Sequence, residues 1–507
     1  MNPIPGPIIL LALPLIAAAV AYLLRRLTLL AALISTLTTG LLAALCWRLP
    51  LDRSSFVLGQ EVGFGRPIVV LGQTLMLDPA GQMWLVFVFG LVAFFYLFAW
   101  RMSQGRSFFS FSLVVVALYV LVVLLQSFAL ATLILAISAT LLVFVLQAGQ
   151  PSLIRGAQRY LVITLLAVPL LLLASWFVDQ SAVYFQDIEG LAGGSSAMAE
   201  VLSQAMARRA LLPAALGFGL LLAAFPFGTW MPAVAAEAPP MVSAFVFTVG
   251  QSMALYLAMS FLGRVPSLLQ DSTTLIVIQL AGLVMAAAGG VMAAVQRDFG
   301  RLFGYAALSD LGILLLALGS GGSQGLRLAL LHGINRSVSI TLVAAALAVL
   351  RHRATTDRFE ALRGMGRHLP VATAGLVLGG LALAGFPFTA GFGTHWAVRL
   401  ATWNWVQPFS PQAEGSVPPA MGIVPLQEWL WVLTLVALIA SSLGIVVGLL
   451  RGLGAMQGDG ARPDVARQPI IASLLVLGLA AFSLVLGLYP QLFLEPVSEA
   501  VRMFSLF

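Results

Sequence analysis

Few ionisable side chains stand deep inside the long apolar stretches of this sequence, and most of them lie in its second half. They are Asp310, His332 and Arg336, with His395 close after a predicted helix break. Ionisable groups at such depth are costly, so they are functional candidates by default. Histidine can take up and release a proton near neutral pH, whereas arginine keeps its charge. These residue types therefore point to the handling of protons or other ions.

The spacing of these residues predicts that three of them meet. His332 and Arg336 are four residues apart, which places both on one side of a helix. Asp310 lies roughly ten residues into its own apolar stretch and Arg336 roughly ten into the next, so both should reach a similar depth. An unpaired buried charge costs several kcal/mol, which favours an Asp310–Arg336 ion pair. A purely structural pair is the alternative interpretation.

Three further residues are candidates for the ion path, and each also has a purely structural interpretation. His395 could serve the ion path or be a satisfied packing histidine. Glu237 is an ion-path candidate, with a surface cap or loop acid as its alternative. Gln251, with its neighbours Thr248 and Ser252, could hold water at mid-depth in the first half. Hydrogen bonds between helices are the alternative for these neutral groups.

The composition identifies a membrane protein. The chain is 60% hydrophobic and 9% charged, with a mean hydropathy of +1.02. Ordinary soluble domains carry about a quarter charged residues. Uncharged stretches recur from end to end, so the sequence predicts an all-α polytopic membrane protein. The net charge of +7 is then a signal of membrane topology, and no nucleic-acid partner is expected.

Several other classes of protein are excluded by missing motifs. Cys46 is the single cysteine, so no internal disulfide can form, and no Cys/His spacing resembles a metal or iron–sulfur site. No glycine-rich phosphate loop follows a strand, and no sizeable polar region could hold a nucleotide domain. We therefore expect no cofactor, and no redox or hydrolytic centre within the chain itself.

Hydropathy predicts about fourteen spans of about 20 residues each. The first, roughly residues 7 to 24, is followed by Arg25 and Arg26 and is expected to be a retained helix instead of a signal peptide. Connections alternate in charge: 351–369 is arginine-rich and 179–200 is acidic. The positive-inside rule then places both termini on the outer side of the inner (plasma) membrane. The expected spans start near residues 4, 27, 80, 108, 127, 159, 208, 241, 274, 300, 326, 370, 429 and 470.

The segment 51–79 is expected to form a small external hairpin, because RPIVVLGQTLMLD has short apolar alternations between turn residues. An irregular loop is the alternative. Asp78, at its end, is expected to be a helix N-cap. The charged run 351–369 is expected to be a solvated connection.

Two apolar stretches are interrupted by the same tripeptide. FPF occurs at 225–227, in FPFGTWMPAVAAEAP, and at 386–388, in LALAGFPFTAGFGTHWAV. Proline removes a backbone donor and glycine is poorly helical, so both segments should be discontinuous helices. Interrupted spans in corresponding positions of two halves indicate an internal repeat with an ion or substrate path near the break. Two coincidental loop ends are the alternative.

These motifs resemble a known family. FPFGTWMPAVAAEAPPMVSAF resembles the "PFHTWLPDA…AP.PVSAL" signature of the antiporter-like subunits of respiratory complex I, membrane-bound hydrogenases and multisubunit cation/proton antiporters. Four more motifs follow the family's order. They are VLGQTLMLDPAGQMW (70–84), QRDFGRLFGYAALSDLG (296–312), LALLHGINRSVSI (328–340) and LPVATAGLVLGGLALAGFPFTAGFGTHW (369–396).

The resemblance implies fourteen spans, external termini, inverted repeats and two broken helices. It divides the chain into N-terminal helices with the hairpin (1–107), a first repeat (108–262), a second repeat (274–451) and a C-terminal helix with its tail (470–507). It also implies other membrane subunits as partners, and any redox centre would belong to them.

Most of the family's proton relay is replaced in this sequence. In the first half, the positions that match the relay's Glu, Lys and His are apolar. In the second half His332 survives, Arg336 replaces a lysine, and His395 replaces another. None of the 26 basic residues is lysine. The matched first-half positions are Ala136–Ile137, Leu221 and Phe247, and the signature's own His and Asp become Gly228 and Ala233.

The sequence thus favours a membrane subunit of a complex I-like assembly that supports proton or cation translocation, with a degenerate first half-channel. It could be part of an NADH:quinone oxidoreductase-type translocase. Two alternatives share the fold. One is the membrane subunit of an energy-coupled inorganic-carbon uptake complex, and the other is a multisubunit Na⁺/H⁺ antiporter component. A shared fold cannot separate them.

Overall fold

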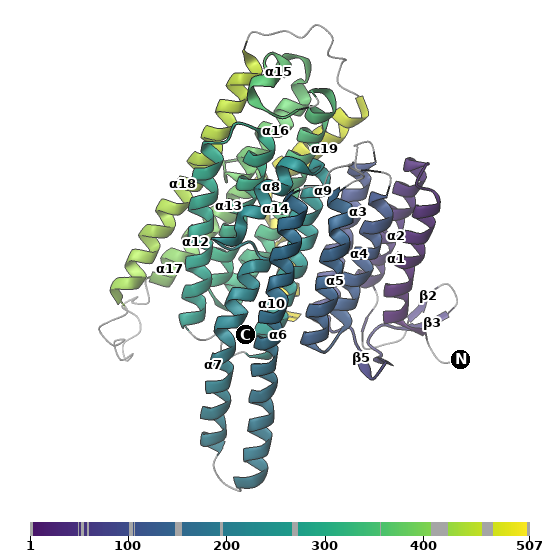
Figure 1. Ribbon diagram of the computed structural model, residues 1–507, viewed down its shortest axis with the longest axis vertical. Coiled ribbons are helices and arrows are strands. Elements are labelled where there is room, and N and C mark those ends of the chain that lie inside the picture. Colours follow the sequence, from purple (N-terminus) through teal and green to yellow (C-terminus); the bar gives the residue numbers. More distant parts are fainter. Residues whose placement is uncertain are drawn as a thin grey trace. The chain divides into compact units, whose positions relative to one another are not determined.

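The computed structural model describes residues 4–48, 50–51, 55–57, 60–100, 105, 107–147, 155–192, 196–265, 272–354, 356–406, 424–458 and 470–503. Helices dominate these residues, as Figure 1 shows. The chain divides into two compact units. The first comprises Met1–Ala223, Glu237–Leu269 and Arg502–Phe507, and the second comprises Ala224–Ala236 and Gln270–Val501.

The first unit is a bundle of helices. Its neighbouring pairs are α2 with α3, α1 with α4, α4 with α5, and α6 with α7. A π-helical turn, Val246–Gly250, joins α9 to α10. The helices are α1 (Gly6–Leu23), α2 (Thr28–Arg48), α3 (Pro79–Ala99), α4 (Phe108–Leu124), α5 (Phe128–Gln147), α6 (Arg155–Ala192), α7 (Ser196–Leu221), α9 (Pro240–Phe245) and α10 (Gln251–Arg264).

Five short strands precede α3 in the chain: β1 comes before α1, and the other four lie between α2 and α3. β1 (Ile4–Pro5), β3 (Gln60–Gly63) and β2 (Ser55–Val57) form one sheet, and β4 (Ile68–Val70) pairs with β5 (Gln73–Leu75). The antiparallel β4–β5 pair confirms the predicted hairpin. Asp78 is confirmed as the N-cap of α3, because its Oδ1 accepts a hydrogen bond from the Gly81 amide at 2.8 Å.

The second unit is built around α12 (Ser272–Ala294), α13 (Phe299–Gly319) and α14 (Gly322–Ala354). Small residues let α12 and α13 approach closely: a Cβ on Gly282 would lie 2.6 Å from the Gly312 carbonyl oxygen. Asp298 caps α13 by accepting from the Arg301 amide at 2.7 Å. The other helices are α8 (Trp230–Glu237, the last residue counted with the first unit), α15 (Met365–His368), α16 (Pro370–Leu383), α17 (Ala390–Val406), α18 (Val424–Gln457), α19 (Ile470–Leu488) and α20 (Leu494–Met503).

Both predicted helix breaks are confirmed. After α7, Ala223 takes a left-handed φ of 56°, and a 3₁₀ turn at Phe227–Thr229 leads into α8. Between α16 and α17, Gly385 and Phe388 have φ of 68° and 67°. The freed backbone groups at this second break find partners, as a membrane interior requires: Ser442 Oγ donates to the Ala384 carbonyl at 2.7 Å.

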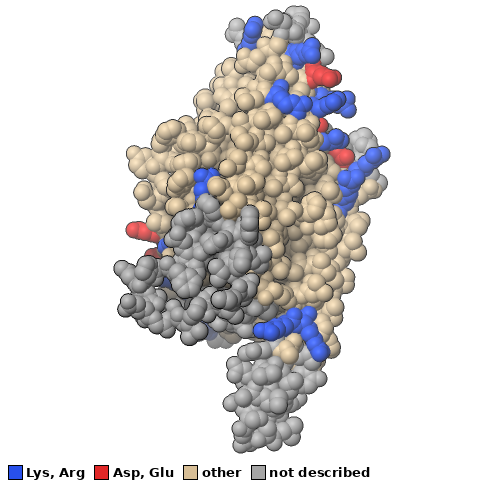
Figure 2. All heavy atoms as spheres, turned by 90° about the vertical axis from the view of Figure 1, so that its left-hand side faces the viewer, with Lys and Arg blue, Asp and Glu red and all other residues tan. Residues whose placement is uncertain are grey.

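Eleven helices of the described residues are long and apolar enough to cross a membrane, and two shorter apolar helices are Phe108–Leu124 and Pro370–Leu383. A helix lies in each of the expected spans, and the number fourteen itself stays a prediction. On the face in Figure 2, most of the described surface is uncharged. Outward residues of α18 such as Val436, Leu443 and Leu450 are 56–61% exposed, as suits a helix facing lipid.

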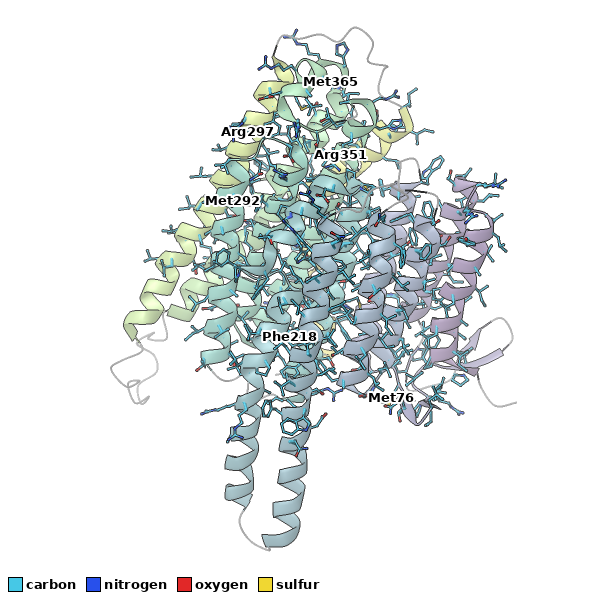
Figure 3. The ribbon with its side chains drawn as sticks, in the orientation of Figure 1. Met76, Phe218, Met292, Arg297, Arg351 and Met365 are labelled. Carbon is cyan, nitrogen blue, oxygen red and sulfur yellow. The ribbon has the colours of Figure 1, made fainter. Side chains whose placement is uncertain are left out.

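The segment 351–369 is more ordered than the solvated connection that we expected. Arg351, labelled in Figure 3, forms an ion pair with Asp357 at 2.6 Å and donates to the Ala235 and Ala236 carbonyls at 2.7 and 3.1 Å. Asp357 Oδ2 also accepts from the Gly300 amide at 2.9 Å. The arginine therefore ties the end of α8 to the first turn of α13, which a charge count along the sequence cannot reveal.

Candidate functional site

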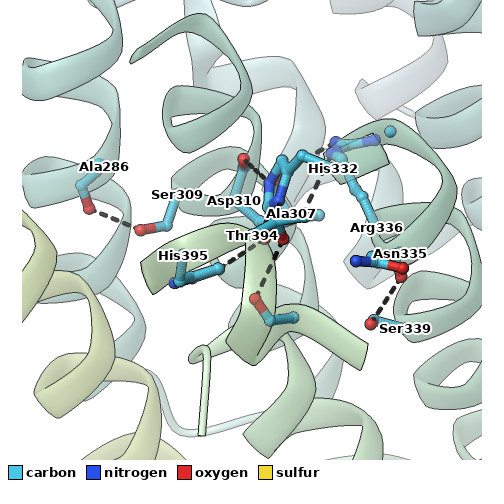
Figure 4. Close-up of polar contacts among 12 residues, drawn as sticks. Ala286, Ala307, Ser309, Asp310, His332, Asn335, Arg336, Ser339, Thr394 and His395 are labelled. Carbon is cyan, nitrogen blue, oxygen red and sulfur yellow. Dashed lines mark hydrogen bonds and ion pairs between the residues drawn. The ribbon is translucent and has the colours of Figure 1, made fainter. Parts of the chain in front are cut away.

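Three helices of the second unit bring the candidate residues together. Asp310 lies midway along α13, His332 and Arg336 lie one turn apart on α14, and His395 lies near the start of α17 (Figure 4). All four side chains are buried, with Asp310 1% and His332 0% exposed. The second break makes this possible, because it places the first turns of α17 beside α13 and α14.

Asp310 is the centre of the cluster. Its Oδ2 lies 3.4 Å from Arg336 Nε, which confirms the predicted ion pair. Its Oδ1 lies 3.3 Å from His332 Nε2 and 3.4 Å from His395 Nε2. One carboxylate therefore contacts one guanidinium and two imidazoles, and Arg336 neutralises its buried negative charge.

Arg336 is fixed by a second contact, since its Nη2 donates to the Ala307 carbonyl at 3.1 Å. A guanidinium keeps its proton in proteins, so Arg336 acts as a permanent charge and cannot carry a proton in a relay. The two histidines are the groups of this cluster that can do so. Their ring centroids are 5.5 Å apart.

Thr394 is a member of the site that sequence reasoning missed. Its hydroxyl lies 2.9 Å from His332 Nδ1 and donates to the Gly391 carbonyl at 3.1 Å. Because a hydroxyl has one hydrogen, both contacts are satisfied together when His332 Nδ1–H donates to Thr394. The sequence signal was its position beside His395, directly after the glycine-rich break.

The tautomer of His332 determines whether its Nε2 carries a hydrogen or a lone pair. In a neutral imidazole with hydrogen on Nδ1, Nε2 carries a lone pair. That nitrogen faces Asp310 Oδ1 at 3.3 Å and the Asp310 carbonyl oxygen at 3.1 Å. With its hydrogen on Nε2, His332 donates to the Asp310 carbonyl. With its hydrogen on Nδ1, Nε2 can instead bind a cation beside Oδ1.

The remaining candidates lie elsewhere. Glu237 is exposed, and its carboxylate accepts from the Gly156 amide at 2.8 Å at the start of α6, which matches the cap alternative. Gln251 is buried at the start of α10. Thr248 and Ser252 donate to carbonyls of their own helical segment, those of Ala244 and Val249, at 2.7 and 2.8 Å.

A helical membrane bundle with a broken helix beside a buried acid, guanidinium and imidazoles is typical of an antiporter-like membrane subunit. The chain belongs to the NADH:quinone oxidoreductase/Mrp antiporter transmembrane family, whose model matches residues 127–414. The recognition made from the five sequence motifs is thereby confirmed.

Two curated relatives and one solved structure illustrate the similarity. The chain is 32% identical over 175 residues to the hydrogenase-4 component F homolog of Methylacidiphilum infernorum, covering 34% of this chain and 36% of the relative. It is 29% identical over 290 residues to NADH-quinone oxidoreductase subunit N of Geobacter metallireducens, covering 56% and 55%. These matches span about a third to somewhat over half of the relatives' length.

The solved structure is the membrane-bound sulfane sulfur reductase, an archaeal respiratory membrane complex. One of its chains superimposes with a TM-score of 0.72 at 18% identity, covering 98% of this chain and 97% of that one. At this identity the likeness shows the fold alone. The protein is thus a multi-pass, antiporter-like membrane subunit.

Proposed function

We propose that this chain supports proton or cation translocation as a subunit of a complex I-like assembly in the plasma membrane, and that its second half carries the ion path. The observation that carries the proposal is the contact of one buried carboxylate with Arg336, His332 and His395 at 3.3–3.4 Å. Buried charge of this kind is costly and marks ion pathways in membrane proteins.

The two imidazoles would pass a proton in this path. Both lie within 3.4 Å of Asp310 Oδ1, so transfer of a proton from one ring to the other would leave the total charge beside that carboxylate unchanged. Arg336 would keep the carboxylate ionised by its fixed charge. A proton relay needs such exchangeable sites at similar energy.

The first half would not form a working path. The positions that match the family's relay there are Ala136–Ile137, Leu221 and Phe247, all without a titratable group. The hydroxyls of Thr248 and Ser252 donate hydrogen bonds to backbone carbonyls of their own helical segment. The repeat boundaries, 108–262 and 274–451, belong to this proposal.

The test of the ion path uses the two histidines. His332→Ala and His395→Ala should leave assembly intact and slow proton movement at least about tenfold in vesicles that contain the whole complex, because general acid–base groups contribute at least that much. His352→Ala, at an exposed site on α14, is the matched control. If both cluster variants assemble and translocate at the wild-type rate, the chain is a structural arm.

The parent complex is identified by what co-purifies with the tagged protein in mild detergent. Iron–sulfur or quinone-reducing subunits would support the complex I-like assembly. Small antiporter subunits would identify a multisubunit Na⁺/H⁺ antiporter, and a soluble zinc protein would identify an inorganic-carbon uptake complex. Either of the last two results would overturn the proposed assembly while leaving the ion path to its own test.

A further inference from the structure

The cluster around Asp310 has the composition and spacing of a metal site. Asp310, His332 and His395 each offer one ligand atom, and these three atoms lie within 4.8 Å of one another. Two imidazoles and one carboxylate form a common set of three protein ligands that leaves a fourth position open. No spacing motif in the sequence announced this set, because its members come from three separate helices.

The distances suit a small tetrahedral ion. Ligand atoms about 2.0–2.2 Å from zinc are separated from each other by roughly 3.3–3.6 Å in a tetrahedron. The Asp310 Oδ1 contacts with His332 Nε2 and His395 Nε2 measure 3.3 and 3.4 Å. The third edge, between the two ring nitrogens, is at most 4.8 Å, which a small rotation of one imidazole would close.

The surrounding contacts also suit metal binding. The Thr394 hydroxyl lies 2.9 Å from Nδ1 of His332, and when Nδ1–H donates to it, Nε2 offers its lone pair on the side of Asp310. A hydrogen-bond partner on the second ring nitrogen is the usual support of a ligating histidine. Arg336 occupies Oδ2, so Oδ1 remains as a single ligand oxygen.

Ligand type and charge narrow the choice of ion. Imidazole nitrogens favour borderline transition metals such as Zn²⁺, whereas Mg²⁺ and Ca²⁺ prefer oxygen ligands. The positive charge of Arg336 weakens the attraction for a dication, so we expect an affinity below that of structural zinc sites. A hydroxide at the fourth position would offset part of the added charge, because zinc lowers the pKa of bound water to about 7.

We propose that Asp310, His332 and His395 form a binding site for one divalent transition-metal ion, with Zn²⁺ as the best-suited ion. Binding itself does not depend on the proposed ion path. Its consequence does: an ion held on both Nε2 atoms would stop the two histidines from carrying protons, so zinc would inhibit translocation through this subunit.

The binding test uses the full-length chain in detergent, stripped with a chelator and freed of any histidine tag. Titration with ZnCl₂ should give one ion per chain, with MgCl₂ unable to compete. Co²⁺ should give the visible absorption of a tetrahedral site. His332→Gln and His395→Gln should each weaken Zn²⁺ binding at least about tenfold, and Thr394→Val about 10–100-fold.

The chain supplies its own controls. The other two histidines, His352 and His368, are exposed, and His352→Gln and His368→Gln should bind Zn²⁺ as the wild type does. Thermal unfolding of each variant shows that it is folded, and Thr394→Val tests the site without removing a ligand. Absence of binding in the wild type, or binding unchanged in both His332→Gln and His395→Gln, would overturn the proposal.

Measurement of proton translocation with and without bound zinc distinguishes failure of the metal site from failure of the proposed ion path. Zinc that binds at the cluster and blocks translocation supports both. Zinc that binds without changing flux leaves the metal site standing and removes the ion path from these histidines. Inhibition that persists in the histidine variants would place the inhibitory ion elsewhere and overturn the proposed consequence.

Discussion

At the scale of single residues, Asp310 lies at the centre of the buried polar cluster in the second unit. Its two oxygens serve different partners: Oδ2 faces the fixed charge of Arg336, and Oδ1 faces two imidazoles. The ion pair offsets the cost of burying the carboxylate, and in the proposed ion path the imidazoles exchange a proton beside it. Stability and the proposed ion path therefore depend on the same side chain, and substitutions at its partners should separate the two.

Removal of Arg336 should damage stability more than any other single change at the site. Arg336→Ala leaves Asp310 buried without its permanent counter-charge, which costs about 3–5 kcal/mol. Thermal unfolding of the purified protein and the yield of assembled complex measure this loss. Arg367→Ala, at an exposed position of the same unit, should be near neutral.

A double-mutant cycle shows whether the ion pair is the cause. Asp310→Asn combined with Arg336→Met removes both charges, so it should be less destabilising than Arg336→Met alone, and Asp310→Asn alone completes the cycle. If Arg336→Ala unfolds at the wild-type temperature, the guanidinium does not hold the carboxylate in place.

At the scale of elements, the break between α16 and α17 positions half of the cluster. Gly385 turns the chain with a φ of 68°, and α17 then begins at Ala390 and presents Thr394 and His395 within its first turns. A continuous helix would have carried these two residues away on its own axis. The interruption is thus what allows a third helix to reach Asp310.

Gly385→Ala tests this break. A left-handed conformation costs a residue with a Cβ about 1–2 kcal/mol, and the new Cβ would also overlap the His395 imidazole. We expect a lower unfolding temperature together with slower translocation. Gly454→Ala is the matched control, since that helical glycine of α18 has open space around it. Equal behaviour of the two variants would show that the break does not depend on Gly385.

For the segment formed by α9, the π turn and α10, we expect substitutions to have little effect on flux. Its polar groups, Thr248 and Gln251, are buried but not titratable. Thr248→Ala and Gln251→Ala should therefore change flux less than about twofold, measured in the same vesicles as His395→Ala, where acid–base chemistry is removed. A large loss of flux would mean that neutral groups and water carry a path through the first half.

At the scale of the whole molecule, the chain is 60% hydrophobic and 9% charged, and arginine stands in place of lysine throughout. Arginines near the ends of spans orient a membrane protein, and 351–369 is the richest of its arginine runs. We propose that this run faces the cytoplasm and that both termini face outward.

Cysteine labelling in intact cells checks this orientation. Cys46 is buried, and Cys46→Ser gives a background without thiols. An impermeant thiol reagent should label Gln73→Cys, on the exposed β4–β5 hairpin, without permeabilisation, and Arg363→Cys only after it. Labelling in the reverse order would invert the topology.

Local patterns of the sequence were enough to predict the helical membrane fold, the hairpin, the cap at Asp78 and both helix breaks. Hydropathy, proline and glycine act on a few neighbouring residues, so their effects can be seen without the rest of the chain. The Asp310–Arg336 pair also followed, because depth along two consecutive spans is a one-dimensional property.

What only the tertiary structure decided is the contact of both imidazoles with the same carboxylate oxygen, the part played by Thr394, and the attachment of Arg351 to the end of α8. These depend on how each helix is rotated about its axis and where the chain goes after a break. Such rotations are set by the packing of side chains from distant segments, such as the close approach of Gly282 to Gly312. Spacing along one helix cannot encode them.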